Sequence, residues 1–112
     1  MKVITTSSPF GSRTRTRVLV ALDLLGESYP RELARILGAA PSVVQKAVQS
    51  LEGDGLIAGR AVGRTRVYAV NPGYFAVKEL RSLARRIGGA DIELRRRVDS
   101  LRTRPRRGGK PL

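Results

Sequence analysis

The stretch that decides the fold runs from Ser28 to Val70 and reads SYPRELARILGAAPSVVQKAVQSLEGDGLIAGRAVGRTRVYAV. Its first half contains two short segments with apolar residues at helical spacing, separated by a turn at Gly38. Its second half changes to two β-branched runs, 57–62 and 65–70, which are joined through Gly63 and Arg64. We therefore expect two helices linked by a tight turn and followed by an antiparallel hairpin.

Capping residues indicate where the first three helices begin. Ser12 is a suitable N-cap for a helix over about 13–25, and Pro30 and Pro41 suit the first positions of the next two helices, where a missing N–H does no harm. Tyr29 is expected to form a one- or two-residue strand that braces the hairpin. The third helix has an apolar stripe at i, i+3, i+4 and i+7, formed by Val44, Ala47, Val48 and Leu51.

Two further helices are expected after the breaker Asn71-Pro72-Gly73. The first covers about 74–87 and is interrupted by Gly88-Gly89, and the second is capped by Asp91 and continues to about Leu101. The predicted fold class is mainly α with a small β-hairpin, a winged helix-turn-helix with a three-helix core, a wing and one or two C-terminal helices. The expected divisions are a flexible arm over 1–11, a winged domain over 12–73, C-terminal helices over 74–101 and a disordered basic tail over 102–112.

Composition limits the classes of function. The 112 residues carry 22 Lys and Arg against 9 Asp and Glu, a formal net charge of +13, which favours a polyanionic partner such as nucleic acid or an anionic membrane surface. We expect no membrane partner, because the sequence lacks an apolar face with large side chains. The absence of Cys and His excludes disulfides, Cys/His zinc sites and His-dependent nucleophilic triads. We expect no enzyme, metal or cofactor, and a cytoplasmic protein, since no signal-peptide core or apolar run of membrane-spanning length is apparent.

The face of the third helix opposite its apolar stripe is polar. Ser42, Gln45, Lys46 and Gln49 are spaced i, i+3, i+4 and i+7 and therefore form one exposed row. Gln suits adenine, Lys suits guanine acceptors or phosphate, and Ser suits either role in a major groove of duplex DNA. The alternative is an ordinary solvated helix face, but the position after a tight turn and before a basic hairpin favours recognition.

Arginines supply a second group of candidate DNA contacts. Arg60, Arg64 and Arg66 surround the hairpin turn, and no acidic residue lies between Asp54 and Glu79, so we expect them to bind phosphates or enter a minor groove. Tyr68 and Val70 share the hairpin face that we assign to the core. Arg31 and Arg13 are further candidates for phosphate contacts or for plain solvation, and Glu27 and Glu32 are near enough in sequence to neutralise Arg31.

The apolar residues of the two C-terminal helices indicate a homodimer. The expected interface residues are Leu80, Leu83, Ile87, Leu94, Val98 and Leu101. A final helix with so thin an apolar stripe is marginal on its own, and a second subunit would explain its persistence.

The stretch from Phe10 to Val70 resembles the winged helix-turn-helix domains of ArsR-like and MarR-like bacterial transcriptional regulators. The resemblance rests on FGSRTRTRVLVALDLL, on YPRELARILGAAPSVVQKAVQSLEGDGLI and on GRTRVYAVNP. It implies a DNA-binding regulator with Ser42, Gln45, Lys46 and Gln49 at recognition-helix positions and Arg64 and Arg66 on the wing, and it implies a homodimer that pairs through the first and last helices. Metal-sensing members use Cys and His ligands, so this chain is not expected to sense metals. A sequence-tolerant, nucleoid-type DNA binder and a winged-helix module for protein or RNA binding remain alternatives.

Overall fold

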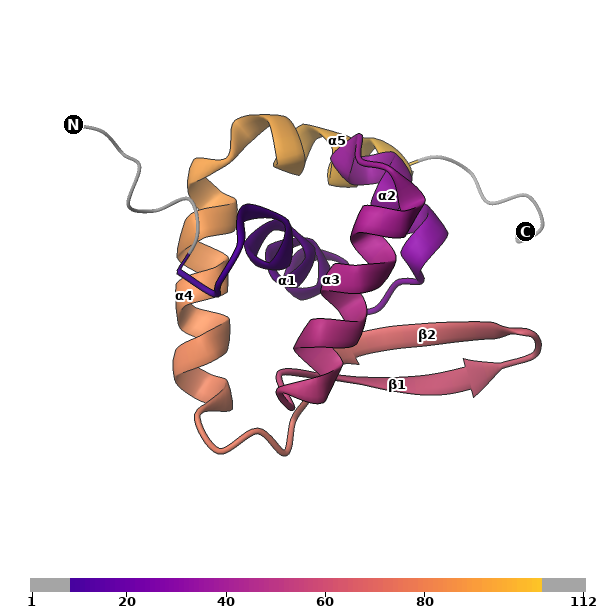
Figure 1. The fold of residues 1–112 in the computed structure, drawn as a ribbon. Coiled ribbons are helices and arrows are strands. Elements are labelled where there is room, and N and C mark those ends of the chain that lie inside the picture. Colours follow the sequence, from indigo (N-terminus) through magenta and orange to yellow (C-terminus); the bar gives the residue numbers. More distant parts are fainter. Residues whose placement is uncertain (1–8, 104–112) are drawn as a thin grey trace.

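Five helices and one hairpin make up residues 9–103, the part of the chain that the computed structural model describes (Figure 1). In chain order these elements are α1 (Arg13–Leu25), α2 (Pro30–Leu37), α3 (Pro41–Gly53), β1 (Ile57–Val62), β2 (Thr65–Val70), α4 (Val77–Ala90) and α5 (Ile92–Thr103). The predicted fold class is confirmed: a helix-turn-helix is followed by a hairpin and two further helices.

The ends of the first three helices follow the predicted caps. Ser12 lies in extended backbone, and its hydroxyl accepts a hydrogen bond from the Arg15 backbone N–H at 3.1 Å. Pro30 and Pro41 occupy the first positions of α2 and α3. Gly38 ends α2 in the left-handed region at φ 63°, where a residue without Cβ is least strained, and this turn directs the chain into α3.

The hairpin pairs β1 and β2 antiparallel, from Ile57 opposite Val70 to Val62 opposite Thr65. Tyr68 and Val70 face the core, as predicted, and both side chains are buried. A third strand position braces the hairpin, but it is Ser28 and not Tyr29 that forms it. The Ser28 N–H donates to the Tyr68 carbonyl at 3.0 Å, and the Tyr68 N–H donates back at 2.7 Å. Tyr29 is instead the N-cap of α2.

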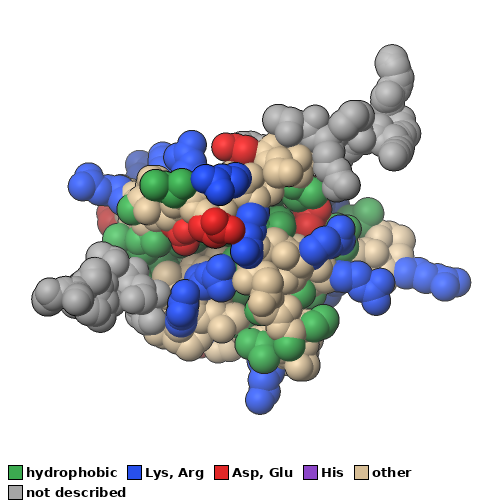
Figure 2. Space-filling view, turned by 90° about the horizontal axis from the view of Figure 1, so that it is seen from above, with side chains coloured by type: hydrophobic (Ala, Val, Ile, Leu, Met, Phe, Trp, Pro, Cys, Tyr) green, Lys and Arg blue, Asp and Glu red, His purple; other side chains and the backbone are tan. Residues whose placement is uncertain are grey.

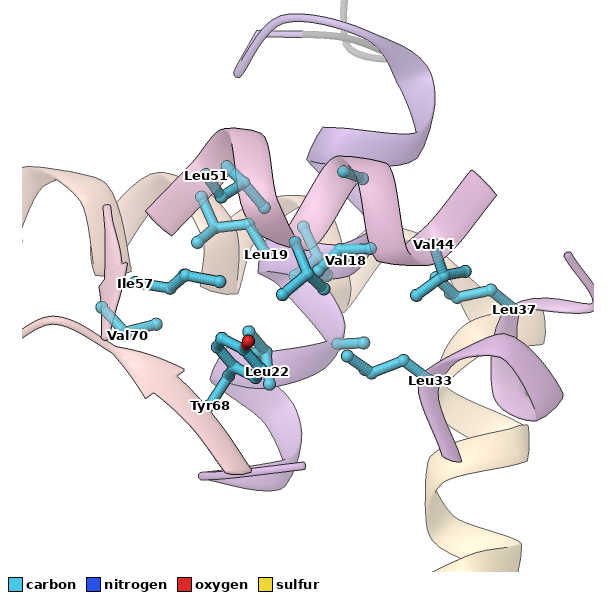
Figure 3. Close-up of a cluster of buried hydrophobic side chains, with 14 of the residues drawn as sticks. Val18, Leu19, Leu22, Leu33, Leu37, Val44, Leu51, Ile57, Tyr68 and Val70 are labelled. Carbon is cyan, nitrogen blue, oxygen red and sulfur yellow. The ribbon is translucent and has the colours of Figure 1, made fainter. Parts of the chain in front are cut away.

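Helix α1 lies at the centre of the fold, and the other helices and β2 pack around it (Figure 1). Figure 3 shows Leu19 and Leu22 of α1 pointing into a cluster that includes Leu33 of α2, Val44 of α3 and Tyr68 of β2. Each fully buried Leu or Val of this kind contributes about 1.5–3 kcal/mol relative to an exposed one. The core therefore fixes which face α3 turns to solvent.

Helix α4 departs from the prediction at both ends. It begins at Val77 and not near 74, because residues 74–76 still form turns, and it continues through Gly88-Gly89 to Ala90. Gly88 is buried against α1: a Cβ placed there would lie 3.2 Å from Cγ1 of Val20. The glycine that we expected to interrupt the helix instead allows α4 to approach α1 closely.

The two ends of the described chain are more ordered than predicted. Phe10, assigned to a flexible arm over 1–11, packs against the core, and its backbone N–H donates to Oγ1 of Thr16 at 3.2 Å. Asp91 caps α5 as predicted, with Oδ1 accepting from the Leu94 N–H at 3.0 Å, but the helix extends two residues beyond Leu101 to Thr103. The predictions for the rest of the arm and tail fall on 1–8 and 104–112, outside the described residues.

Candidate nucleic-acid interface

The polar row of α3 faces solvent, because the opposite face of this helix is held in the core. Ser42, Lys46 and Gln49 are exposed, and Gln45 is half-buried. Within residues 9–103, none of these four side chains has a hydrogen-bond or ion-pair partner. The structure thus brings together the four predicted recognition residues on one open helix face, with their donors and acceptors unused.

The hairpin projects away from the helices beside α3 (Figure 1). Two of its three arginines are paired with acidic residues of other elements. In the first ion pair, Nη2 of Arg60 lies 2.8 Å from Oε1 of Glu27. In the second, Nη2 of Arg66 lies 3.0 Å from Oε2 of Glu52. Arg64, at the turn, is exposed and has no such partner among the described residues.

These ion pairs correct part of the sequence argument. Because no acidic residue lies between Asp54 and Glu79 in the sequence, we expected three cations without a counter-charge. The acids that pair with them, Glu27 and Glu52, come from outside that segment. The hydrogen bond with Glu52 and the carboxylate charge raise the pKa of Arg66. Arg66 also lies over the ring of Tyr68, with its guanidinium carbon 5.6 Å from the ring centroid. Of the three, Arg64 alone is fully free to meet a phosphate.

Arg31, in the first turn of α2, is exposed and has no ion-pair partner among the residues that the structure describes. The two acids expected near it are engaged elsewhere. Glu27 pairs with Arg60, and Glu32 accepts a hydrogen bond from the Ser28 hydroxyl at 2.6 Å. Arg31 is therefore available to bind an anion.

Arg13 lies apart from these groups. It lines a pocket of about 730 Å³ between α1, α4 and α5, together with Arg17, Arg86 and apolar side chains that include Leu83 and Ile87. None of the lining residues belongs to α3 or the hairpin. Burial lowers the pKa of Arg17, and the charge of Arg13 lowers it further. The structure does not bring Arg13 together with the α3 row.

Three other arginines hold the framework of the interface, a role that the sequence did not reveal. Arg15 joins α1 to the C-terminal end of α3 through an ion pair with Asp54 at 2.9 Å. Arg17 and Arg97 donate to the last carbonyls of α2, at 3.2 Å to Leu37 O and 2.8 Å to Ile36 O. Cations are favourable at a helix C-terminus, and here they hold the turn that precedes α3.

The predicted dimer residues fall into two groups. Leu80, Leu94 and Val98 are buried in the core of the chain itself, so they are not available to a second subunit in this structure. Ile87 and Leu101 are half-buried, and Leu83 is exposed. Ile92, which we did not predict, is 71% exposed at the start of α5. The thin stripe of α5 thus has a partner within the chain, and its persistence does not require a dimer.

Positive charge extends beyond the hairpin. Figure 2 shows Lys and Arg side chains over much of the face seen from above, interspersed with acidic side chains, and also toward the edge where the hairpin projects in Figure 1. Over residues 9–103, no group of three acidic side chains is arranged to hold a metal ion. No described helix has both the length and the apolar character needed to cross a membrane.

The order of elements and the solvent-facing α3 beside a basic hairpin define a winged helix-turn-helix fold. A solved structure shares this fold: it is described as the X-ray crystal structure of a transcriptional regulator of the MarR family from Rhodococcus sp. RHA1. The two chains are 21% identical, with a TM-score of 0.56, and the match covers 88% of this chain and 78% of that one. No protein-family model and no curated protein matches the sequence.

Proposed function

We propose that this protein is a transcriptional regulator that binds specific sequences in double-stranded DNA. The observation that carries the proposal is the α3 row, whose polar groups have no intrachain partner within the described residues. A major groove about 12 Å wide admits a helix, and its base edges offer acceptors and donors that suit Gln and Lys. The MarR-family description of the similar structure supports a regulatory role.

In this proposal the hairpin and α2 supply phosphate contacts. Arg64 and Arg31 are exposed cations with no ion-pair partner in the described chain, on the two elements that flank α3. Arg60 and Arg66 each lie beside a carboxylate, whose negative charge offsets their own and repels a phosphate. Arg64 and Arg31 are therefore expected to contribute more to affinity than Arg60 and Arg66.

We further infer that two copies act together. Leu83 and Ile92 are large apolar side chains left exposed at the side of α4 and α5 where the pocket beside α1 opens. Their burial between two subunits would remove that surface from water. To read a palindromic site, the two-fold axis would have to place the two α3 helices about 34–36 Å apart, one DNA turn.

The proposal is tested by selecting bound sites from random duplexes and then comparing two double variants on the enriched site. Gln45→Ala with Gln49→Ala removes base-reading groups, whereas Arg81→Ala with Arg85→Ala removes two exposed side chains from α4. We expect the glutamine variant to lose about 1–3 kcal/mol per good base contact on the enriched site and to retain its affinity for random duplex. The arginine variant should bind both duplexes about as tightly as the wild type, because α4 supplies none of the DNA contacts in this proposal.

A second candidate, a sequence-tolerant DNA binder, is favoured by the exposed arginines of α4 and α5, which lie outside the α3 row. The same experiment separates it from the first. In that case no sequence is enriched, the glutamine variant binds every duplex with unchanged strength, and only the arginine variant is weakened.

A further inference from the structure

One apolar side chain stands on the exposed side of α3. Val43 is 45% exposed, although the next residue, Val44, is completely buried. It lies in the first turn of the helix, next to Ser42 and three residues before Lys46. Within residues 9–103, the other large apolar side chains with comparable or greater exposure belong to the hairpin, α4, α5 and the segment before α4.

Nearly half of the surface of Val43 is open to solvent. Its position on the helix leaves it at the border of the row formed by Ser42, Gln45, Lys46 and Gln49. A single exposed Val is ordinary on a protein surface. What distinguishes this one is its place on the helix that we propose to enter a major groove.

The major groove offers one apolar group to such a side chain. Thymine carries a C5 methyl there, whereas the other three bases present polar edges and no methyl. The minor groove offers no equivalent group. A branched aliphatic side chain at the start of α3 therefore has a single apolar partner among the base edges.

We propose that Val43 packs against the C5 methyl of a thymine and so specifies a T·A pair beside the bases read by Ser42 and Lys46. This inference rests on the proposed function, since it requires α3 to lie in the major groove. It adds a specificity-determining residue outside the polar row and names the chemical group that this residue recognises.

The test uses deoxyuridine, which differs from thymidine at the base only by the missing methyl. In the site enriched from random duplexes, each thymine is replaced singly by uracil, and the affinities of the wild-type chain and of Val43→Ala are measured. At one thymine position in each half-site, we expect uracil to weaken the wild type about fourfold, the effect of losing one buried methyl-sized group. Val43→Ala should bind the thymine and uracil duplexes at that position equally.

Val62 provides a matched control. It is also 45% exposed, but it lies beside the hairpin turn, so Val62→Ala removes the same atoms from a surface that does not enter the major groove. This control should keep the full fourfold difference between thymine and uracil. Val43→Thr, which keeps one γ-methyl, should retain part of it, and circular dichroism checks that each variant is folded.

The outcomes separate this inference from the function on which it rests. If a site is enriched but every uracil substitution changes the affinities of wild type and Val43→Ala by the same factor, the role of Val43 is refuted. The regulator proposal then still stands. Loss of the difference in Val62→Ala as well would also refute the role of Val43. If no sequence is enriched at all, the proposed function falls, and this inference falls with it.

Discussion

The ion pair between Arg60 and Glu27 gives a prediction with an unusual sign: removing an acid should strengthen DNA binding. Both side chains are largely in solvent, with exposed fractions of 64% and 54%, and their charged atoms are 2.8 Å apart. An exposed pair of this kind contributes about 0.2–1 kcal/mol, and Arg60 gives up that interaction to reach a phosphate. In Glu27→Gln the guanidinium is free beforehand, so the affinity for the enriched duplex should rise by about 1.4- to 5-fold at low salt.

The same substitution removes one negative charge and so raises the net charge by one. A control is needed to separate this general effect from the release of Arg60. Glu93→Gln makes the same change in net charge at an exposed pair, in which Glu93 Oε2 lies 3.0 Å from Nε of Arg97 on α5. Fluorescence anisotropy titrations of both variants against one duplex, over a range of salt concentrations, give the comparison. An equal rise in the two variants, or no rise in Glu27→Gln, would refute the placement of Arg60 at the DNA backbone.

Three further predictions address the interface, the packing of α4 and the assembly. Arg64→Ala should reduce the slope of log affinity against log salt by about 0.9, the value for one phosphate contact, whereas Arg85→Ala on α4 should leave the slope on the enriched site closer to wild type. Gly89→Ala has open space around its new Cβ and should raise the free energy of unfolding by about 0.5–1 kcal/mol. Gly88→Val should lower it by about 1–3 kcal/mol, because its new atoms meet α1. Denaturant titrations measure both changes. Ile92→Ser should shift the mass measured in sedimentation toward that of the monomer, and an unchanged mass would contradict the proposed assembly.

Local structure could be predicted closely from the sequence, because its determinants are local. Ser12, Pro30, Pro41 and Gly38 each act within one helical turn, and the helices begin and end where these residues indicate. The hairpin follows in the same way from alternating β-branched residues around Gly63. Even the open face of α3 could be foreseen, since its apolar stripe leaves only one side for solvent.

The charges of the hairpin could not be predicted in this way, because their partners are distant in sequence. Arg60 pairs with Glu27 across 33 positions, and Arg66 pairs with Glu52 across 14. A count of acids within the hairpin segment misses both. Sequence composition therefore overestimates the number of free cations on the hairpin, and the structure distinguishes Arg64 from its two neighbours.

Gly88 shows how one residue type supports opposite interpretations. In an isolated helix, glycine weakens the structure by about 1 kcal/mol relative to alanine, which is why a glycine pair suggested an end to α4. Tertiary packing reverses the conclusion here, because the missing Cβ lets α4 approach Val20 and Leu24 of α1. Only the partner helix reveals this, and a sequence pattern does not name the partner.

The C-terminal helices are thereby part of the unit that presents α3. Leu80 and Leu94 lie in the same core cluster as the side chains of α1, α2 and α3, so a boundary near residue 73 separates elements that share one core. Arg97 reaches across 61 positions to the Ile36 carbonyl, in the last turn before the bend that leads into α3. Through Arg97, α5 therefore contacts the end of α2 directly, just before the turn that leads into α3.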